Sequence, residues 1–298
     1  MDIRLATHND VPAIVNLLKL SLGESLMPKS EKFWRWKHIE NPFGASPVLL
    51  ATEGNHLVGV RAFMRWEWKH GDKILKAVRA VDTATHPDYQ GRGIFSRLTR
   101  QLVDFCQEQG IHFIFNTPNA KSKPGYLKMG WYQAGRLPVH LKLVIGPFSE
   151  RAQKFVRPGW DEVIELSKTM AAYPGLSTCY KPGFIDWRYL NNPNIKYFLT
   201  GNEEGIAIYR LKEHRWGREM RVTDLFLPPG KPGKHLSALI MQTARIEHAR
   251  LITLAGYNQL AWGCVVPAGP VVTIRLLNCK EPITFRNWHP TLGDMEVF

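Results

Sequence analysis

The chain has 298 residues, of which 44% are hydrophobic and 22% charged, and it carries a formal net charge of +13. This composition is typical of a soluble globular protein with one large or two ordinary domains, and no apolar run reaches the roughly 20 residues of a membrane span. Lys and Arg are spread over both halves without a dense basic block or a recognisable reading motif, so a nucleic-acid partner is not expected.

The first half predicts alternating strands and helices. The N-terminus opens as a strand rather than as a signal peptide, and Asp10 with Pro12 marks the start of an amphipathic helix over 10–18. Apolar residues at three- and four-residue spacing predict another helix from Ile94 to Cys106. Between the two helices three strands are expected, at 48–52, 58–69 and 74–85.

The turn between the last of these strands and the second helix is the most informative segment. Thr85-His86-Pro87 ends the strand, and Gln90-Gly91-Arg92-Gly93-Ile94-Phe95 leads into the helix. Glycines at such a turn let backbone N–H groups approach a ligand, and the helix dipole adds positive charge at the same place. The segment therefore predicts a phosphate or pyrophosphate site. Its spacing matches neither the nucleoside-triphosphate loop nor the dinucleotide fingerprint.

The loop resembles the acetyl-CoA loop of the GCN5-related N-acetyltransferases (GNAT), whose pattern is Gln/Arg-x-x-Gly-x-Gly/Ala. Gln90 and Gly93 match the pattern, whereas Phe95 stands where a small residue is usual. A strand over 111–115 then leads to Asn116, and the segment 126–131 reads Tyr-Leu-Lys-Met-Gly-Trp, which resembles the family's Tyr-x-x-x-Gly-aromatic sequence. Together with the Pro before the loop, these matches occur in the family's order.

The resemblance implies acetyl-CoA as co-substrate. The loop amides would hold its pyrophosphate, the strand edge before the loop would pair with the pantetheine amides, and an Asn after the next strand would lie beside the cofactor arm. The implied cofactor-binding residues are Thr83, Ala84, Thr85, Gln90, Gly91, Arg92, Gly93, Ile94, Phe95, Asn116 and Asn119.

Acyl transfer to an amine needs an acid for the leaving thiolate and a base for the amine proton. The resemblance assigns the acid to Tyr126, since a phenol has a pKa of about 10, near that of a thiol; a packed helix tyrosine is the alternative. Asp82 is the candidate base because a carboxylate is out of pattern in a Val/Ala/Thr strand. Equally, Asp82 could be structural, bound to Arg79 or to a loop amide. Weaker candidates are Glu67, His86, a water chain and a carboxylate of the segment 293–298.

An internal repeat relates the two halves. Residues 33–42 recur in altered form at 184–193, 151 positions later. The Phe, the Trp, a basic residue after the Trp and the closing Asn-Pro align in the two segments. Such a repeat predicts duplicated domains. Trp36 and Trp187 are expected to pack in the core or between the domains. A second interpretation places three residues of these segments in an acceptor wall: Trp34, Arg35 and Arg188.

The second half predicts the same order of elements without the loop. A helix is expected at 161–166, strands at 196–200, 207–212 and 220–226, and a helix at 236–250. The loop between the last two lacks the acetyl-CoA pattern, and its prolines remove amide donors. We therefore expect an α/β (α+β) chain of two GNAT-like domains in tandem, each a mixed, mostly antiparallel central sheet flanked by helices. The expected units are 1–145 with the acetyl-CoA loop, a linker at 146–159, and a degenerate domain at 160–298 that shapes the acceptor site.

The expected function is transfer of an acetyl group from acetyl-CoA to a primary amine of a small-molecule or sugar-like acceptor, which the basic charge suggests is anionic. Two alternatives are transfer to a protein or peptide amine and a non-catalytic acyl-CoA-binding module. Four cysteines without ligand spacing predict reduced thiols, a cytoplasmic location and no metal site. The internal repeat is compatible with a monomer and with a homodimer.

Overall fold

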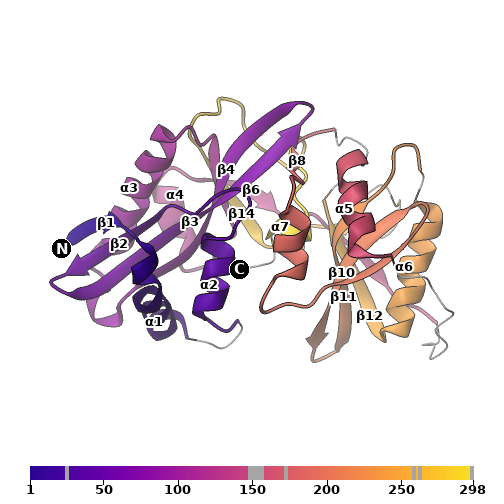
Figure 1. Cartoon of the computed structure of the whole chain (residues 1–298), viewed down its shortest axis with the longest axis horizontal. Coiled ribbons are helices and arrows are strands. Elements are labelled where there is room, and N and C mark those ends of the chain that lie inside the picture. The colour runs from indigo at the N-terminus through magenta and orange to yellow at the C-terminus, as the bar shows by residue number, and fades with distance from the viewer. Residues whose placement is uncertain are drawn as a thin grey trace.

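The computed structural model describes residues 1–23, 27–146, 158–170, 174–231, 233–256, 260 and 264–295. These residues form two sheets, each covered by helices, that lie side by side along the long axis of the molecule (Figure 1). The described helices include none that is long and apolar enough to cross a membrane. The predicted α/β class with two sheets is confirmed.

The first sheet is mostly antiparallel, and only β4 and β5 run parallel. Its strand order is β1 (Asp2–Leu5), β2 (Val48–Glu53), β3 (His56–His70), β4 (Lys73–Thr85), β5 (Phe113–Asn116), β14 (Val271–Leu276) and β6 (Tyr132–Arg136), with β8 (Ser177–Thr178) paired to the far end of β3.

Two pairs of helices cover the faces of this sheet. On one face lie α3 (Ile94–Glu108) and α4 (Lys123–Lys128), and on the other α1 (Val11–Leu22) and α2 (Glu31–His38) (Figure 1). The sheet meets α3 closely at Gly59, because a Cβ there would lie 2.6 Å from Ile94. Only glycine permits this approach, which brings the start of α3 down onto the strands.

The second sheet has the strand order β13 (Cys264–Val266), β7 (Val139–Leu143), β12 (Ala249–Ala255), β11 (Gly217–Phe226), β10 (Gly205–His214) and β9 (Phe198–Asn202). One face packs against α6 (Lys234–Ile246). Two further helices, α5 (Trp160–Thr169) and the short α7 (Leu292–Met295), contact β11.

The two sheets do not follow the predicted boundaries. β7 lies within 1–145 but pairs with β12 and β13 of the second sheet. Conversely, β14 lies within 160–298 but is inserted between β5 and β6 of the first sheet. β8 also lies within 160–298 and pairs with β3 of the first sheet. The first part of the chain therefore contributes one strand to the second sheet, and the second part contributes two strands to the first. The predicted helix at 236–250 was too long, since β12 begins at Ala249, and residues 147–157 of the predicted linker lie outside the described residues.

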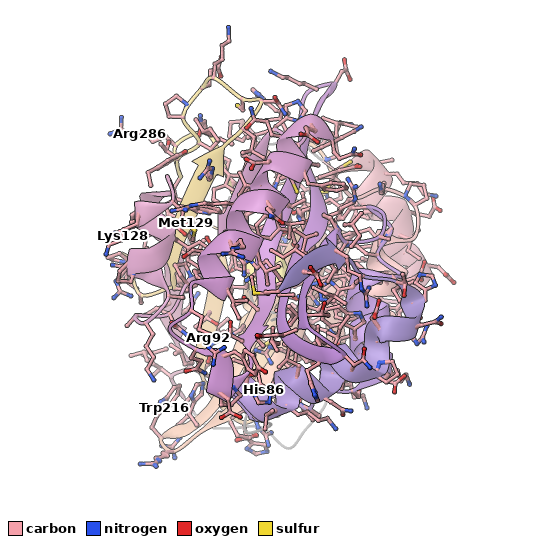
Figure 2. All side chains as sticks on the ribbon, turned by 90° about the vertical axis from the view of Figure 1, so that its left-hand side faces the viewer. His86, Arg92, Lys128, Met129, Trp216 and Arg286 are labelled. Atoms are coloured by element: carbon pink, nitrogen blue, oxygen red, sulfur yellow. The ribbon has the colours of Figure 1, made fainter. Side chains whose placement is uncertain are left out.

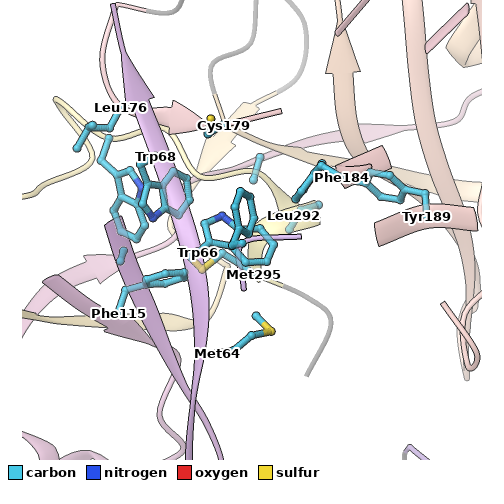
Figure 3. Packing of buried hydrophobic residues seen from close by; sticks show 14 of the residues in the cluster. Met64, Trp66, Trp68, Phe115, Leu176, Cys179, Phe184, Tyr189, Leu292 and Met295 are labelled. Atoms are coloured by element: carbon cyan, nitrogen blue, oxygen red, sulfur yellow. The ribbon is translucent and has the colours of Figure 1, made fainter. Parts of the chain in front are cut away.

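The sequence repeat meets itself where the two halves join. Trp36 Nε1 donates a hydrogen bond to the carbonyl oxygen of Trp187 at 2.6 Å, and Trp187 Nε1 donates to the carbonyl oxygen of Trp36 at 2.6 Å. The two rings stack with centroids 5.1 Å apart. Both residues are buried in an apolar cluster that also contains Trp66 and Trp68 of β3 and Leu292 of α7 (Figure 3). The prediction that these tryptophans pack in the core is confirmed.

We expect Trp36→Phe to lower the free energy of unfolding by about 2–3 kcal/mol, because it removes one hydrogen bond, leaves a buried carbonyl unpaired and opens a cavity. Urea denaturation measures this loss. Trp216→Phe, at a residue that is 48% exposed, is the control. A similar loss of unfolding free energy in both variants would contradict a specific contribution of the hydrogen bonds between Trp36 and Trp187 to stability.

Two carboxyl groups are buried between α7 and β11. Tyr180 Oη donates to Asp224 Oδ1 at 2.8 Å, and Thr178 Oγ1 donates to Asp294 Oδ1 at 2.5 Å. Burial and the neighbouring Asp294 raise the pKa of Asp224 to about 8. Burial also raises the pKa of Asp294. The folded protein therefore holds a proton at this pair under conditions in which the unfolded chain releases it.

This pair predicts a fall in stability with rising pH. A carboxyl whose pKa is raised on folding contributes stability that is complete below its ordinary pKa, about 4, and is lost as the pH rises to about 8. In Asp224→Asn the side chain is neutral throughout. We therefore expect the free energy of unfolding to exceed that of wild type at pH 8 by about 2 kcal/mol, and to depend less steeply on pH. Urea denaturation from pH 4 to 8 measures both quantities, with the exposed Asp88→Asn as control. An unchanged slope in Asp224→Asn would contradict the assignment.

Candidate active site

The site begins where two strands of the first sheet diverge. β4 and β5 pair only over Ala77–Arg79 and Phe113–Phe115. Beyond this point β5 ends at Asn116, while β4 continues to Thr85 with its other edge still paired to β3. The edge of β4 at residues 83–85 therefore faces away from β3 without a strand partner from β5. Such an edge can pair with an extended chain of amides, although the carbonyl of Thr85 already accepts a hydrogen bond from Ser21 Oγ at 3.1 Å.

The predicted glycine loop, residues 90–93, follows the end of β4 and leads directly into α3. Gly91 and Gly93 have φ values of +77° and +73°, a left-handed conformation that glycine adopts without strain. The N–H of Arg97 is the first in the helix to bond back, to the carbonyl of Gly93 at 3.0 Å. The N–H groups of residues 94–96 therefore have no acceptor within the helix and point out of its start, the arrangement that binds phosphate groups.

Two side chains of this region point in different directions. Phe95, the departure from the family pattern, packs edge-to-face against Tyr126 with ring centroids 5.6 Å apart. The Phe95 ring therefore lies against α4, which contains Tyr126. Arg92 is exposed and lies over the ring of Tyr89 at 4.6 Å, on the surface that Figure 2 shows together with His86.

The second half has an equivalent helix start that is already occupied. Gly233 has a φ of +66° and caps α6 as Gly93 caps α3. Here Glu204, from the turn between β9 and β10, accepts hydrogen bonds from the N–H of His235 at 2.6 Å and of Leu236 at 3.3 Å. Burial alone would raise the pKa of Glu204, but the hydrogen bond to the His235 imidazole, together with these backbone bonds, outweighs it and lowers the pKa. A carboxylate of the chain thus sits where a ligand phosphate would bind.

Tyr126 lies on the α3–α4 face of the sheet. Its side chain is buried, and its hydroxyl oxygen accepts a hydrogen bond from Arg61 Nη2 at 2.6 Å. Arg61 is on β3, directly opposite Thr83 of β4. Its guanidinium also lies 4.8 Å from the ring of Phe63 and 5.5 Å from that of Phe95. The Tyr126 hydroxyl oxygen is therefore held by a buried cation on the strand that pairs with β4.

Asp82 lies at a bulge of β4 and points to the opposite, α1–α2 face. The pairing with β3 shifts between Val81 and Thr83, and Asp82 has a φ of +38°. Its carboxylate accepts from Lys37 Nζ at 2.5 Å and from His38 Nε2 at 2.8 Å. Burial alone would raise the pKa of Asp82, but Lys37 and His38 outweigh it and hold the pKa well below its ordinary value. Burial lowers the pKa of His38 despite the carboxylate, so His38 is neutral at pH 7.

A cavity of about 220 Å³ lies between α1 and α2 with Asp82 on its wall. The cavity is largely apolar, and Trp34, one of the residues predicted to line an acceptor wall, is part of it. Arg188, another of those residues, instead donates to the carbonyl of Gly293 at 2.7 Å and is fully buried. The cavity is also lined by Val15, Leu18, Leu22, Met27, Lys29, Ser30, Phe33 and Lys37.

The other predicted residues have partners of their own. Asn116 Oδ1 accepts from Thr273 Oγ1 of β14 at 2.5 Å, and Asn119 Oδ1 accepts from the N–H of Ser122 at 2.9 Å. Arg79, the partner considered for Asp82, donates to the carbonyls of Asp294 at 2.6 Å and Met295 at 2.8 Å.

The remaining candidate bases lie elsewhere. Glu67 pairs with Lys181 at 3.2 Å, near the far end of β3, and His86 Nδ1 accepts from the N–H of Asp88 at 3.3 Å. The C-terminal residues 296–298 lie outside the described part of the chain. Across the described residues, no three His, Cys, Asp or Glu side chains are grouped to hold a metal ion.

Three residues of the site were not predicted from the sequence. Arg61 carried a usable signal, because a charge in the apolar strand 57–64 is as much out of pattern as Asp82 is in β4. Lys37 and His38 carried none, since a basic residue near a helix end is ordinary and nothing in the sequence directs them to Asp82, which in the case of His38 is 44 positions away.

Comparison with known proteins identifies relatives of the first part of the chain. A sequence profile described as an acetyltransferase (GNAT) domain matches residues 2–134. The tRNA(Met) cytidine acetyltransferase TmcA of Thermococcus sp. (strain AM4) is 32% identical over 100 residues, which cover 30% of this chain and 12% of that protein. The chain thus matches only about an eighth of that relative's length.

Solved structures extend the likeness across both sheets. A GCN5-related N-acetyltransferase from Kribbella flavida is 17% identical with a TM-score of 0.65, covering 93% of this chain and 71% of that one. A putative acetyltransferase from Pyrococcus horikoshii is 16% identical with a TM-score of 0.55, covering 94% and 91%. These identities show the fold alone. The profile match identifies an acetyltransferase (GNAT) domain in residues 2–134, and the solved structures share the fold of both sheets.

Proposed function

We propose that the protein transfers an acetyl group from acetyl-CoA to a primary amine of a small-molecule or sugar-like acceptor. The observation that carries this proposal is the junction of an open β4 edge with the glycine-capped start of α3, within the acetyltransferase domain. The loop amides from Gln90 to Phe95 would bind the pyrophosphate, and the backbone of Thr83–Thr85 would pair with the pantetheine amides. Asn116 and Asn119 remain proposed neighbours of the cofactor arm.

Binding at one site per chain is part of the proposal. The start of α6 is the equivalent place in the second half, but the carboxylate of Glu204 already uses its amides. A ligand phosphate would have to displace this carboxylate and would meet its negative charge. The second half is therefore proposed to support the acceptor site rather than to bind acetyl-CoA.

Tyr126 is the proposed acid. Arg61 donates to one lone pair of its hydroxyl oxygen, so the hydroxyl proton is directed away from Arg61. As the carbon–nitrogen bond forms and the carbon–sulfur bond breaks, Tyr126 would give this proton to the leaving thiolate and later recover one from solvent. Arg61 would also disperse the negative charge that the phenol oxygen then carries.

Asp82 is the proposed base on the acceptor side. It lies on the face of the sheet opposite Tyr126 and lines the cavity between α1 and α2. Its low pKa keeps the carboxylate ionised at neutral pH. Once the amine nitrogen has attacked, that nitrogen is positively charged and its proton is far more acidic than in the free amine, so even a weak base can accept it.

We expect Asp82→Asn to lower kcat by about ten- to a hundredfold while leaving the Kd of acetyl-CoA unchanged, because the amide keeps the shape but cannot accept the proton. Steady-state kinetics and calorimetry give the two quantities. Asp72→Asn, in the exposed turn between β3 and β4, is the matched control. An unaltered kcat in Asp82→Asn would leave this residue a structural partner of Lys37 and His38 only.

The function itself is tested by incubating the protein with acetyl-CoA and a panel of acceptors: amino sugars, polyamines, peptides with free amines, and tRNA. Release of the CoA thiol together with an acetylated amine in the mass spectrum supports the proposal. Activity on peptides alone, or on tRNA alone, would replace the proposed acceptor class. Tight binding of acetyl-CoA without turnover on any acceptor would make the protein a non-catalytic binding module.

A further inference from the structure

The cavity between α1 and α2 has a mostly apolar wall. Val15, Leu18 and Leu22 line it from α1, where their spacing places them on one face of the helix. The rings of Phe33 and Trp34 line it from α2. Its volume of about 220 Å³ is below the roughly 300–1,000 Å³ of sites for drug-sized ligands, so it suits a single ring or a short alkyl chain.

The polar groups of this wall are engaged within the protein. Lys37 Nζ lies 2.5 Å from Asp82 Oδ2 and 5.1 Å from the centre of the Phe33 ring. Ser30 Oγ accepts a hydrogen bond from the N–H of Phe33 at 3.1 Å. Lys29 Nζ donates to a backbone carbonyl oxygen at the end of α1. A ligand hydroxyl that entered the cavity would exchange water for groups that already have partners, which weakens binding.

The aromatic part of the wall adjoins the proposed base. The ring centres of Trp34 and His38 lie 4.1 Å apart. His38 Nε2 in turn donates to Asp82 Oδ2 at 2.8 Å. An apolar group bound against Trp34 would therefore lie close to the carboxylate that is proposed to accept the amine proton.

The end of α1 connects the cavity to the proposed cofactor edge. Ser21 Oγ donates to the carbonyl of Thr85 at 3.1 Å, and Thr85 ends the part of β4 that is proposed to pair with the pantetheine amides. Leu22, the next residue of α1, lines the cavity and is 53% exposed. The cavity therefore reaches the surface at Leu22, beside the end of β4.

We propose that this cavity binds the apolar body of the amine acceptor, an aryl or alkyl group joined to the reacting nitrogen by a short chain. The link to the acceptor rests on the proposed transferase function, whereas binding of an apolar group by the cavity does not. The acceptor class thereby narrows to aryl- and alkylamines. Sugar-like amines are disfavoured because their hydroxyl groups would lose water in a wall whose polar groups are already bonded.

Calorimetric titration of 2-phenylethylamine into the protein saturated with CoA measures this binding without turnover, because CoA carries no acetyl group. We expect a Kd at least about tenfold lower than for glucosamine, the effect of burying one ring against apolar side chains. The heat-capacity change should be negative, as it is when apolar surface is buried. Equal Kd values for the two amines, or no binding of 2-phenylethylamine, would overturn the proposal.

Two leucines of α1 provide matched variants. Leu22 lines the cavity and is 53% exposed, whereas Leu20 is 57% exposed and lies two positions earlier, on the opposite side of the helix. Gln at either exposed position should leave the melting temperature close to that of wild type. We expect Leu22→Gln to raise the Kd of 2-phenylethylamine about fivefold and Leu20→Gln to leave it unchanged. Equal Kd values in the two variants would place the bound amine outside this cavity.

Steady-state kinetics with acetyl-CoA test the link to the acceptor. We expect kcat/KM to be at least about tenfold higher for 2-phenylethylamine than for glucosamine, and Leu22→Gln to raise KM for 2-phenylethylamine with kcat unchanged. A higher kcat/KM for glucosamine would support the proposed function and overturn the apolar acceptor. Absence of transfer to any amine would count against the proposed function, whereas 2-phenylethylamine binding weakened only in Leu22→Gln would still support the cavity as an apolar binding site.

Discussion

Gly93→Asp is expected to abolish measurable acetyl-CoA binding, raising the Kd by at least about a hundredfold. Asp is among the residues that best tolerate the left-handed conformation of this position, so the main effect is electrostatic. Its carboxylate would stand among the free amides at the start of α3, as Glu204 does at the start of α6. Two like charges a few ångströms apart in a partly buried site repel by several kcal/mol. Isothermal titration calorimetry measures the loss, together with a stoichiometry of one for wild type.

Two variants separate charge from backbone strain. Gly93→Asn has the same shape without the charge and should lose no more than about tenfold in affinity. Gly110→Asp places the same residue just beyond the other end of α3, where φ is +70° and a Cβ would also meet nothing within 4 Å. This variant should bind acetyl-CoA as wild type does. Unchanged binding by Gly93→Asp would remove the loop from the site, and two bound acetyl-CoA molecules per wild-type chain would mean that the second half binds as well.

Tyr126→Phe is expected to lower kcat by about a hundred- to a thousandfold, the usual contribution of a positioned acid. The Kd of acetyl-CoA should stay within about threefold, because the ring remains packed against Phe95 and Trp131 and only the hydroxyl is lost. Steady-state kinetics with the best acceptor of the panel, together with calorimetry, separate the two effects. The loss should fall on kcat and kcat/KM alike, as for an interaction made mainly in the transition state.

Tyr132→Phe is the matched control. Its hydroxyl donates to the carbonyl of Ile283 at 3.0 Å and accepts from the N–H of the same residue. Its removal should cost about 1–2 kcal/mol of stability and leave kcat unchanged. Equal kcat losses in both variants would show that removal of the Tyr126 hydroxyl lowers kcat by disturbing the structure and not by removing an acid. A wild-type kcat in Tyr126→Phe would contradict its role as the acid.

Local signals in the sequence predicted much of the first sheet and of the loop. The strand at 74–85, the helix from Ile94 and the turn at Gly91 and Gly93 each depend on residues close together in the chain, and each appears in the structure. The repeat marked Trp36 and Trp187 as residues that pack in the core or between the domains, whereas their contact with each other appears only in the structure. The strand, the helix and the turn could be predicted because neighbouring residues determine them.

Long-range partners could not be predicted. The segment 271–276 has the residues of a buried strand, but nothing in it specifies that it pairs with β5 and β6 and not with its neighbours in the second half. Likewise, Asp82 was out of pattern in its strand, yet its partners Lys37 and His38 come from a helix before two further strands. Register and partner choice arise from the assembled surface, which a single sequence does not display.

The exchange of strands also bears on the order in which the chain can fold during synthesis. β5 leaves the ribosome early, but the strand that completes its edge is β14, whose residues 271–276 come near the end of the sequence. An edge that waits this long exposes unpaired backbone groups and invites association with other chains. We infer that the first sheet cannot mature independently as it emerges, and that nascent chains shorter than about 276 residues resist protease far less than the complete protein.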